Sequence, residues 1–349
     1  MFTQATTEEW SDMYRQTVTA SFFQSPEWSH LWCEYAGSRF EPAPLRVQLA
    51  SGRTALFPLT RQRLRGGAGF LWHGAPAGTY GGLLEGDGIM PDPEELAHLL
   101  QSLFEHCGSL VFRPFPLIAD YDVVTRASST HGFSEDTARK ITGISVTPDR
   151  TWLLDCSSGF DAIRDRWAAG SGAMLRKIDK AKNSGVVVRK AVSMEDVAAY
   201  HQLYIDSLER WDPPPVHIYP ETFLRMLAGI SSESRSMWLA EYKGEIIAGA
   251  IVLTGRNHCD YWHGVMSPRY SKLRPVNLMV SSIIESCCHA GIRWFDFNPS
   301  IGLEGVEKFK KSFGTFSVPC PVLRRETLMA RTVMTAGRIA RRIKKAGVR

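Results

Sequence analysis

The sequence predicts an α/β (α+β) fold of two similar units, each a mixed, mostly antiparallel sheet flanked by helices. The two halves repeat one order of strands and helices at a spacing of about 190 residues. Local sequence repeats too, because FLWHGAPAGTY at 70–80 aligns with DYWHGVMSPRY at 260–270. The composition, 44% hydrophobic and 22% charged, is that of an ordinary globular protein with room for two domains.

Turn and capping residues divide the first half into elements. Ser25 and Pro26 predict the start of a helix, and Ser51-Gly52 predicts a hairpin turn. Leucines at helical spacing predict an amphipathic helix that ends before Gly108. The expected elements are a mostly helical segment over 8–36, strands over 45–50, 54–60 and 70–74, a helix over 93–107 and a strand over 109–116.

The second half repeats this order after a longer connection. Gly185 and Gly291 predict helix ends, and Lys243-Gly244 predicts a hairpin. The expected elements are a strand over 144–154, a helix over 158–183, a strand over 186–190, helices over 193–210 and 220–230, strands over 237–242, 245–253 and 259–264, a helix over 276–289 and a strand over 292–297.

The repeat places a domain boundary near residue 150. We expect a first, degenerate domain over 1–150, a second domain over 151–330 that carries the site, and a basic tail over 331–349. The tail holds seven of the 41 lysines and arginines and no acid, so the body is nearly neutral and does not indicate a nucleic-acid-binding surface. The tail itself could contact an anionic membrane or tRNA phosphates, or be a solvated end.

Composition also bears on location. No apolar run of about eighteen residues predicts a membrane span, and the acidic start MFTQATTEEW is unlike a signal peptide. Seven scattered cysteines without a C-x-x-C pair indicate reduced thiols. We expect a cytoplasmic protein, with peripheral contact at the inner face of the membrane through the tail. No metal-ligand spacing surrounds His73 or His263, so no metal is expected.

The stretch over 294–314, WFDFNPSIGLEGVEKFKKSFG, is the most unusual part of the chain. It begins as an aromatic strand that contains Asp296, and a buried carboxylate needs a partner. A turn over 298–302 follows, and then an amphipathic segment that includes Lys308 and Lys310. A strand, a polar loop and a lysine-rich turn in this order predict the wall of a site that holds negative charge.

The order FDF, S-x-G-x-x-G and F-K-x-x-F-G in this stretch resembles the Fem-type (FemAB-like) peptidyltransferases of bacteria. The segments FFQSPEW at 22–28, LRKIDKAKNSG at 175–185 and YHQLYIDSLERW at 200–211 resemble that family as well. The resemblance implies two GNAT-like (N-acetyltransferase-like) domains and no cofactor. It also implies aminoacyl-tRNA as co-substrate and an amine acceptor on a phosphorylated cell-envelope precursor or a peptide.

The resemblance implies catalytic roles for three residues. Lys310 would stabilise the oxyanion of a tetrahedral intermediate, although lysines at this spacing also form solvated helix faces. Asp296 would orient Lys310, position the amine or pair with Arg293, or else cap the turn that follows it. Tyr261 would help to position the reactants, or be a core residue.

Nine further residues are expected to contact substrates. Basic residues late in the helix over 158–183 would hold the acceptor's phosphates, although such cations also stabilise the helix dipole. The aromatic residues among the nine have a core role as their alternative. The alternative for Asn298 and Ser300 is a structural role in the turn, and for the other basic residues a solvated surface position. The nine are Arg176, Lys177, Lys180, Tyr204, Arg210, Trp262, Asn298, Ser300 and Lys308.

The donor is the open question. GNAT domains that use acyl-CoA bind its pyrophosphate on the backbone amides of a glycine-containing loop. The equivalent loop over 271–278 has no glycine, and Pro275 removes one amide. We therefore favour aminoacyl transfer from aminoacyl-tRNA. The alternatives are an acyl-CoA-dependent N-acyltransferase of polysaccharide biosynthesis and a non-catalytic binding protein on the same scaffold.

Overall fold

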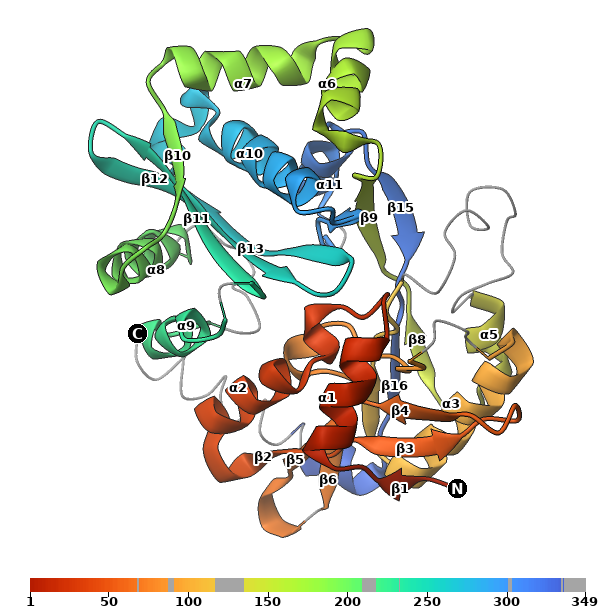
Figure 1. Ribbon diagram of the computed structural model, residues 1–349. Helices are drawn as coiled ribbons and strands as arrows, with labels where there is room; N and C mark the ends of the chain where they lie inside the picture. The colour runs from red at the N-terminus through yellow and green to blue at the C-terminus, as the bar shows by residue number, and fades with distance from the viewer. Residues whose placement is uncertain are drawn as a thin grey trace. The chain divides into compact units, whose positions relative to one another are not determined.

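The computed structural model describes residues 1–67, 69–86, 91–116, 135–208, 218–231, 233–300, 303–333 and 335. The chain divides into two compact units (Figure 1). Unit 1 comprises Met1–Asp149 and Pro319–Arg349, and unit 2 comprises Arg150–Val318. Among the described residues, no helix is long and apolar enough to span a membrane.

Unit 1 contains a six-stranded sheet in the order β2-β5-β6-β7-β16-β8 and a small sheet in the order β1-β3-β4. Ser25 caps α2 and Pro26 occupies its first turn, as the sequence predicts. The elements of unit 1 are β1 (Thr3–Gln4), α1 (Thr7–Gln16), η1 (Phe22–Gln24), α2 (Pro26–Ala36), η2 (Gly37–Arg39), β2 (Phe40–Pro42), β3 (Leu45–Gln48), β4 (Thr54–Phe57), β5 (Thr60–Arg63), η3 (Arg65–Gly67), β6 (Phe70–His73), η4 (Pro76–Gly78), α3 (Pro93–Cys107), β7 (Leu110–Phe112), α5 (Glu135–Lys140), β8 (Ser145–Thr147) and β16 (Val322–Arg325).

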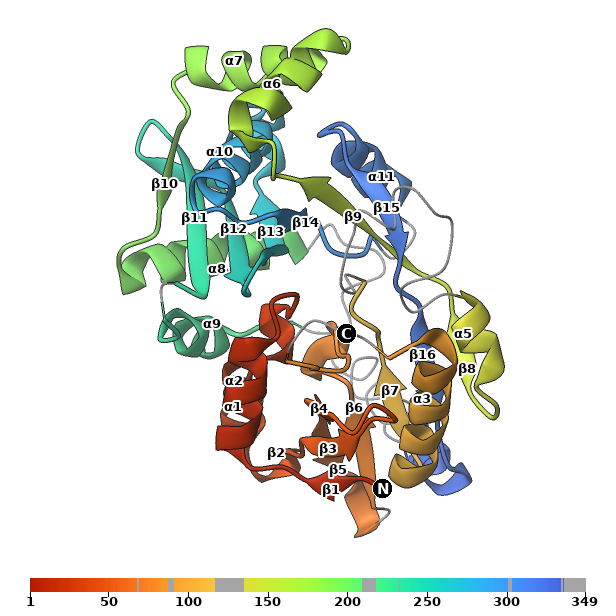
Figure 2. The ribbon, with the colours of Figure 1, turned by 45° about the vertical axis from the view of Figure 1, so that its right-hand side comes forward.

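Unit 2 contains a seven-stranded sheet in the order β10-β11-β12-β13-β14-β9-β15. Helices α6, α7 and α10 lie on one face of this sheet and α8 lies on the other (Figure 2). The elements of unit 2 are β9 (Arg150–Asp155), α6 (Gly159–Ala169), α7 (Ala173–Asn183), β10 (Val187–Lys190), α8 (Met194–Leu208), α9 (Glu221–Ala228), β11 (Arg235–Tyr242), β12 (Glu245–Thr254), β13 (His258–Met266), η5 (Pro268–Leu273), α10 (Pro275–His289), β14 (Trp294–Asp296), α11 (Glu304–Lys311) and β15 (Phe316–Pro319).

The predicted mixed α/β architecture and its internal repeat are confirmed. In unit 1, β6 pairs antiparallel with β5 and parallel with β7, and α3 connects β6 to β7. In unit 2, β13 pairs antiparallel with β12 and parallel with β14, and α10 makes the connection. A parallel pair needs such a crossover, which explains why an amphipathic helix recurs at this point of each half.

Two expected elements are each split in the structure. The helix expected over 158–183 is two helices, α6 and α7, because Gly172 adopts a φ of +64°, a conformation that favours glycine. The strand expected over 144–154 is β8 and β9, which belong to different sheets. Strand β16, inside the range that we expected for the second domain, pairs with β7 and β8 of unit 1.

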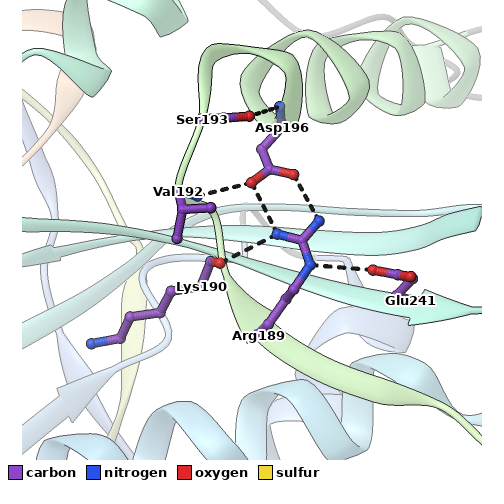
Figure 3. A network of polar contacts seen from close by, with 6 residues as sticks. All are labelled: Arg189, Lys190, Val192, Ser193, Asp196 and Glu241. Atoms are coloured by element: carbon purple, nitrogen blue, oxygen red, sulfur yellow. Dashed lines mark hydrogen bonds and ion pairs between the residues drawn. The ribbon is translucent and has the colours of Figure 1, made fainter. Parts of the chain in front are cut away.

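An ion-pair network ties α8 to the edge of the unit 2 sheet (Figure 3). Arg189 on β10 donates two hydrogen bonds, of 2.9 and 2.7 Å, to the two carboxylate oxygens of Asp196. Its Nε donates to Glu241 on β11 at 3.2 Å. The backbone N–H of Val192 also donates to Asp196, at 2.8 Å. Bidentate geometry of this kind fixes both partners, so the network sets the start of α8.

Candidate active site

Two buried carboxylates lie side by side where β13 and β14 run parallel. The register pairs Asp260 with Asp296 and Cys259 with Phe295. Cys259 and Phe295 belong to the hydrophobic core shared with α10. Because side chains alternate along a strand, Asp260 and Asp296 point to the opposite face of the sheet.

The imidazole of His258 lies between these carboxylates. Its Nδ1 is 3.2 Å from Asp260 Oδ2, and its Nε2 is 3.4 Å from Asp296 Oδ2. All three residues are fully buried. Burial lowers the pKa of His258, but the charges and hydrogen bonds of Asp260 and Asp296 outweigh it and raise this pKa to about 10. The imidazole is therefore a cation at neutral pH.

The other carboxylate oxygen of Asp296 accepts hydrogen bonds from two groups. The hydroxyl of Thr151 on β9 donates to Oδ1, and so does the backbone N–H of Asn298, at 2.6 Å. The second bond caps the turn after β14, which is the structural role predicted for Asp296 as an alternative to its functional roles. Asp296 thus joins β9, β13 and the loop after β14.

That loop carries two buried polar groups. Asn298 adopts a φ of +58°, which is uncommon for a residue other than glycine and is best tolerated by asparagine and aspartate. Ser300 is 4% exposed. The side-chain atoms Asn298 Nδ2 and Ser300 Oγ have no hydrogen-bond partner among the described residues, which do not include 301 and 302. Buried donors of this kind are suited to binding a ligand oxygen.

Lys310 is the buried lysine of α11, with only 5% of its surface exposed. Its Nζ donates a hydrogen bond of 2.5 Å to the backbone carbonyl oxygen of Asn298. Lys308 is exposed and pairs with Glu304, one helical turn away. Lys311 lies over the ring of Trp152. The structure therefore separates Lys310 from its two lysine neighbours and places it against the loop over 297–300.

An aromatic cluster links this loop to β13. The ring of Tyr261 packs against Phe297 at 6.0 Å, and Phe297 packs against Phe309 and Phe313 at 6.4 and 5.3 Å. Burial raises the pKa of Tyr261, so its hydroxyl stays protonated. A Cβ atom on Gly264 would lie 2.2 Å from that hydroxyl, so only glycine lets the ring take this position. Tyr261 is thus held close to the segment that carries Asp296 and Asn298.

The basic residues of α7 lie on its solvent side, away from the core side chains Met174 and Ile178. Arg176 donates from Nη1 to the backbone carbonyl of Ser171 at 2.8 Å and braces the break between α6 and α7. Lys180 is exposed and Lys177 is half-buried. They remain candidates for phosphate contact, and the structure gives Arg176 a local structural role as well.

Two further candidates, Tyr204 and Trp262, lie in a second aromatic cluster, around α8 and α9. Tyr204 is buried and packs edge-on to His263 at 4.7 Å. Trp262 packs against Tyr219 at 5.0 Å. Tyr204 thus has the contacts of a core residue, whereas Trp262 is half-buried. Arg210 and most of the basic tail, from 336 onward, lie outside the described residues.

Sequence reasoning missed His258, Asp260 and Thr151. The signal for the first two was present, because His258-Cys259-Asp260 places two ionisable side chains on one face of a strand next to a buried cysteine. A strand with this pattern indicates a buried charge pair or a site. The sequence around Thr151 gives no such signal, because its hydrogen-bond acceptor, Asp296, lies far away in the sequence.

The comparisons define the class of protein. A model of the acetyltransferase (GNAT) domain matches residues 172–311, which lie in unit 2. No curated protein matches the sequence significantly. The match and the fold support an acyltransferase of the GNAT type.

Solved structures narrow the architecture. FemX is similar to this chain with a TM-score of 0.64 and 12% identity, over 92% of this chain and 96% of its own. A conserved protein of unknown function from Bacteroides thetaiotaomicron VPI-5482 has a TM-score of 0.56 and 9% identity, over 93% of this chain and 99% of its own. The C-terminal domain of a protein described as a putative lysylphosphatidylglycerol synthetase, from Agrobacterium fabrum, has a TM-score of 0.52 and 10% identity. This similarity covers 96% of this chain and 97% of that domain. The chain therefore has the Fem-like GNAT architecture that its sequence motifs predict.

Proposed function

We propose that this protein transfers an aminoacyl group from aminoacyl-tRNA to an amine of a phosphorylated cell-envelope precursor or a peptide. The observation that carries the proposal is the buried ammonium of Lys310, held against Asn298 beside two polar groups for which the described residues offer no partner. A buried cation with adjacent donors stabilises negative charge that develops on a substrate oxygen.

The reaction balances without a cofactor. The acceptor amine attacks the ester carbonyl of the donor, a C–N bond forms, and the carbonyl oxygen becomes an oxyanion that Lys310 stabilises. The C–O ester bond then breaks, and the amine proton reaches the leaving hydroxyl through the substrates themselves. Asn298 Nδ2 and Ser300 Oγ are the further donors that we assign to the substrate, and Tyr261 is the aromatic wall that positions it.

The start of α10 supports a donor other than acyl-CoA. Pro275 supplies no N–H there, and the N–H groups of Asn277 and Leu278 both donate to the carbonyl of Arg274, at 3.1 and 3.5 Å. Arg274 itself adopts a φ of +61°. Few amides therefore remain at this helix start for a pyrophosphate.

Donor binding tests the proposal. Purified protein would be titrated with a mixed aminoacyl-tRNA pool, with the same pool after deacylation, and with acetyl-CoA, and thermal stabilisation would be followed. We expect stabilisation by the charged pool, less by the deacylated pool and none by acetyl-CoA. Stabilisation by acetyl-CoA alone would overturn the proposal in favour of an acyl-CoA-dependent N-acyltransferase.

A further inference from the structure

We propose that His258 is a positioning residue, which holds Asp296 and, through it, the loop on which Lys310 rests. This inference rests on the proposed function for the role of Lys310, but not for the contacts themselves. The stretch over 294–314 that resembles the Fem-type peptidyltransferases contains Asp296 and Lys310, but neither His258 nor Asp260.

A continuous chain of polar contacts leads from Asp260 to Lys310. His258 contacts Asp260 at 3.2 Å through Nδ1 and Asp296 at 3.4 Å through Nε2. Asp296 accepts from the backbone N–H of Asn298, and the backbone carbonyl of the same residue accepts from Lys310. Asn298 is thus held at both ends of its backbone, by an acid on one side and by the lysine on the other.

Charge explains why a histidine occupies this place. Asp260 and Asp296 are 0% exposed and directly paired across two strands, and two buried carboxylates repel each other unless a cation lies between them. His258 contacts Asp260 through one ring nitrogen and Asp296 through the other, so its imidazole lies where a cation offsets this repulsion.

Burial argues for positioning rather than direct catalysis. His258 and Asp260 are fully covered, and both carboxylate oxygens of Asp296 have protein partners. None of these atoms can reach a substrate without breaking a contact. Their effect on the reaction therefore passes through the geometry of the loop.

A metal ion is the rival occupant of this cluster. His258, Asp260 and Asp296 each offer one ligand atom, and these atoms lie within 4.8 Å of one another. A bound divalent cation would require a neutral imidazole and would take the place of the imidazolium as the balancing charge. The two readings differ in the protonation of His258 and in metal content.

Three variants separate charge balance from positioning. His258→Gln removes the cation and leaves two facing carboxylates, so we expect a large fall in the thermal unfolding midpoint. The double variant His258→Gln/Asp260→Asn also removes one carboxylate charge and should recover most of this loss. His289→Gln, an exposed histidine of α10, is the control and should leave the midpoint unchanged.

The reactivity of Lys310 reports its position without any assay of transfer. Brief acetylation with acetic anhydride, followed by peptide mass spectrometry, gives the rate at Lys310 relative to the exposed Lys308 on the same helix. In the double variant we expect this ratio to rise several-fold, because the loop no longer holds Lys310 in place. An unchanged ratio in the folded double variant would overturn the proposal and leave the cluster as a charge pair only.

Turnover adds a second readout where aminoacyl transfer is observed. We expect the double variant to lose about 10²-fold in kcat with little change in KM, the size of effect that a displaced catalytic group produces. If wild-type protein shows no aminoacyl transfer while the Lys310 ratio still responds, the proposed function fails and the positioning role stands.

Two measurements on wild-type protein keep the inference testable if the variants do not fold. Nitrogen-15 spectra of the His258 ring should show both nitrogens protonated at pH 8, and a neutral ring would contradict the proposal. Incubation with Zn²⁺ or Mn²⁺ followed by metal analysis should leave the protein metal-free. Stoichiometric binding that raises the unfolding midpoint would show that the cluster is a metal site.

Discussion

Lys310 Nζ donates its hydrogen bond to the carbonyl oxygen of Asn298, a residue with a φ of +58°. The peptide that receives the lysine is therefore turned by an uncommon backbone conformation. This hydrogen bond holds Lys310 against the loop over 297–300, so we expect a substitution in the lysine or in the loop to affect the other.

Replacing Lys310 by methionine tests the oxyanion role. Methionine keeps most of the side-chain volume and removes the charge, so we expect kcat to fall by about 10²–10³-fold. Lys311→Met is the matched control on the same helix and should leave kcat unchanged, since Lys311 is 54% exposed and pairs with Glu307. Steady-state kinetics of aminoacyl transfer would measure both. Equal losses in the two variants would contradict a specific role, and unchanged donor affinity without any turnover to lose would favour a binding protein.

The conformation of Asn298 predicts an order of stabilities. Asn298→Gly keeps the left-handed backbone without steric cost, whereas Asn298→Ala places a Cβ in a strained position at a cost of about 1 kcal/mol. Urea unfolding should therefore rank wild type and the glycine variant together, above the alanine variant. A glycine variant as unstable as the alanine variant would show that the buried amide, not the backbone, is what the loop needs.

Gly264→Ala tests the position of Tyr261. A Cβ there would lie 2.2 Å from the Tyr261 hydroxyl, so the ring must move, and we expect a loss of about 1–3 kcal/mol in stability together with lower activity. Gly305→Ala in α11 meets nothing within 4 Å and should be neutral or stabilising by up to about 1 kcal/mol. Denaturant unfolding and kinetics on both variants would check this. Unaltered activity in a folded Gly264→Ala protein would remove Tyr261 from the site.

The Arg189–Asp196 pair predicts a pH-dependent contribution to stability. The hydrogen bonds from Arg189 are the main cause that lowers the pKa of Asp196 to about 2, from 3.8. A lowered pKa gives stability that is present above the unfolded value and is lost as pH falls towards 2. With Arg189 36% exposed, we expect Asp196→Asn to cost about 1–2 kcal/mol at pH 6 after solvent screening.

The same variant should cost less at pH 3, because this pH is below the ordinary pKa of 3.8, so the unfolded wild-type chain already protonates Asp196 and part of the pair's contribution is lost. Urea unfolding at the two pH values measures the difference, with Asp206→Asn, on an exposed stretch of α8, as control. A cost that is equal at both pH values would show that the ion pair does not account for it.

The sequence predicted elements well where local signals agree. The helix expected over 93–107 is α3, Pro93–Cys107, because Asp92 caps it, Pro93 starts it and Gly108 ends it. The helix over 158–183 was wrong, since the break at Gly170-Ser171-Gly172 depends on a glycine conformation that periodicity does not report. Helical spacing continues on both sides of such a break.

The candidate site was predictable only in part, for a reason of topology. Lys310, Asp296 and Asn298 lie within one short stretch, and the structure brings their polar atoms together as that stretch suggested. His258 reaches Asp296 through parallel pairing of β13 and β14, and the whole of α10 lies between these strands in the sequence. Contacts of that separation follow from the fold and not from local pattern.

Strand β16 lies between β7 and β8 in unit 1, yet it is made after all of unit 2. On the ribosome, Met1–Asp149 therefore emerges with a gap in its sheet, while Arg150–Val318 emerges as one uninterrupted piece. Synthesis of the intervening stretch, about 170 residues, takes roughly 10–30 s. Throughout that interval β7 and β8 have open edges, which are templates for pairing with other chains. The order of the strands thus leaves the N-terminal half of the nascent protein with unpaired strand edges until β16 is made.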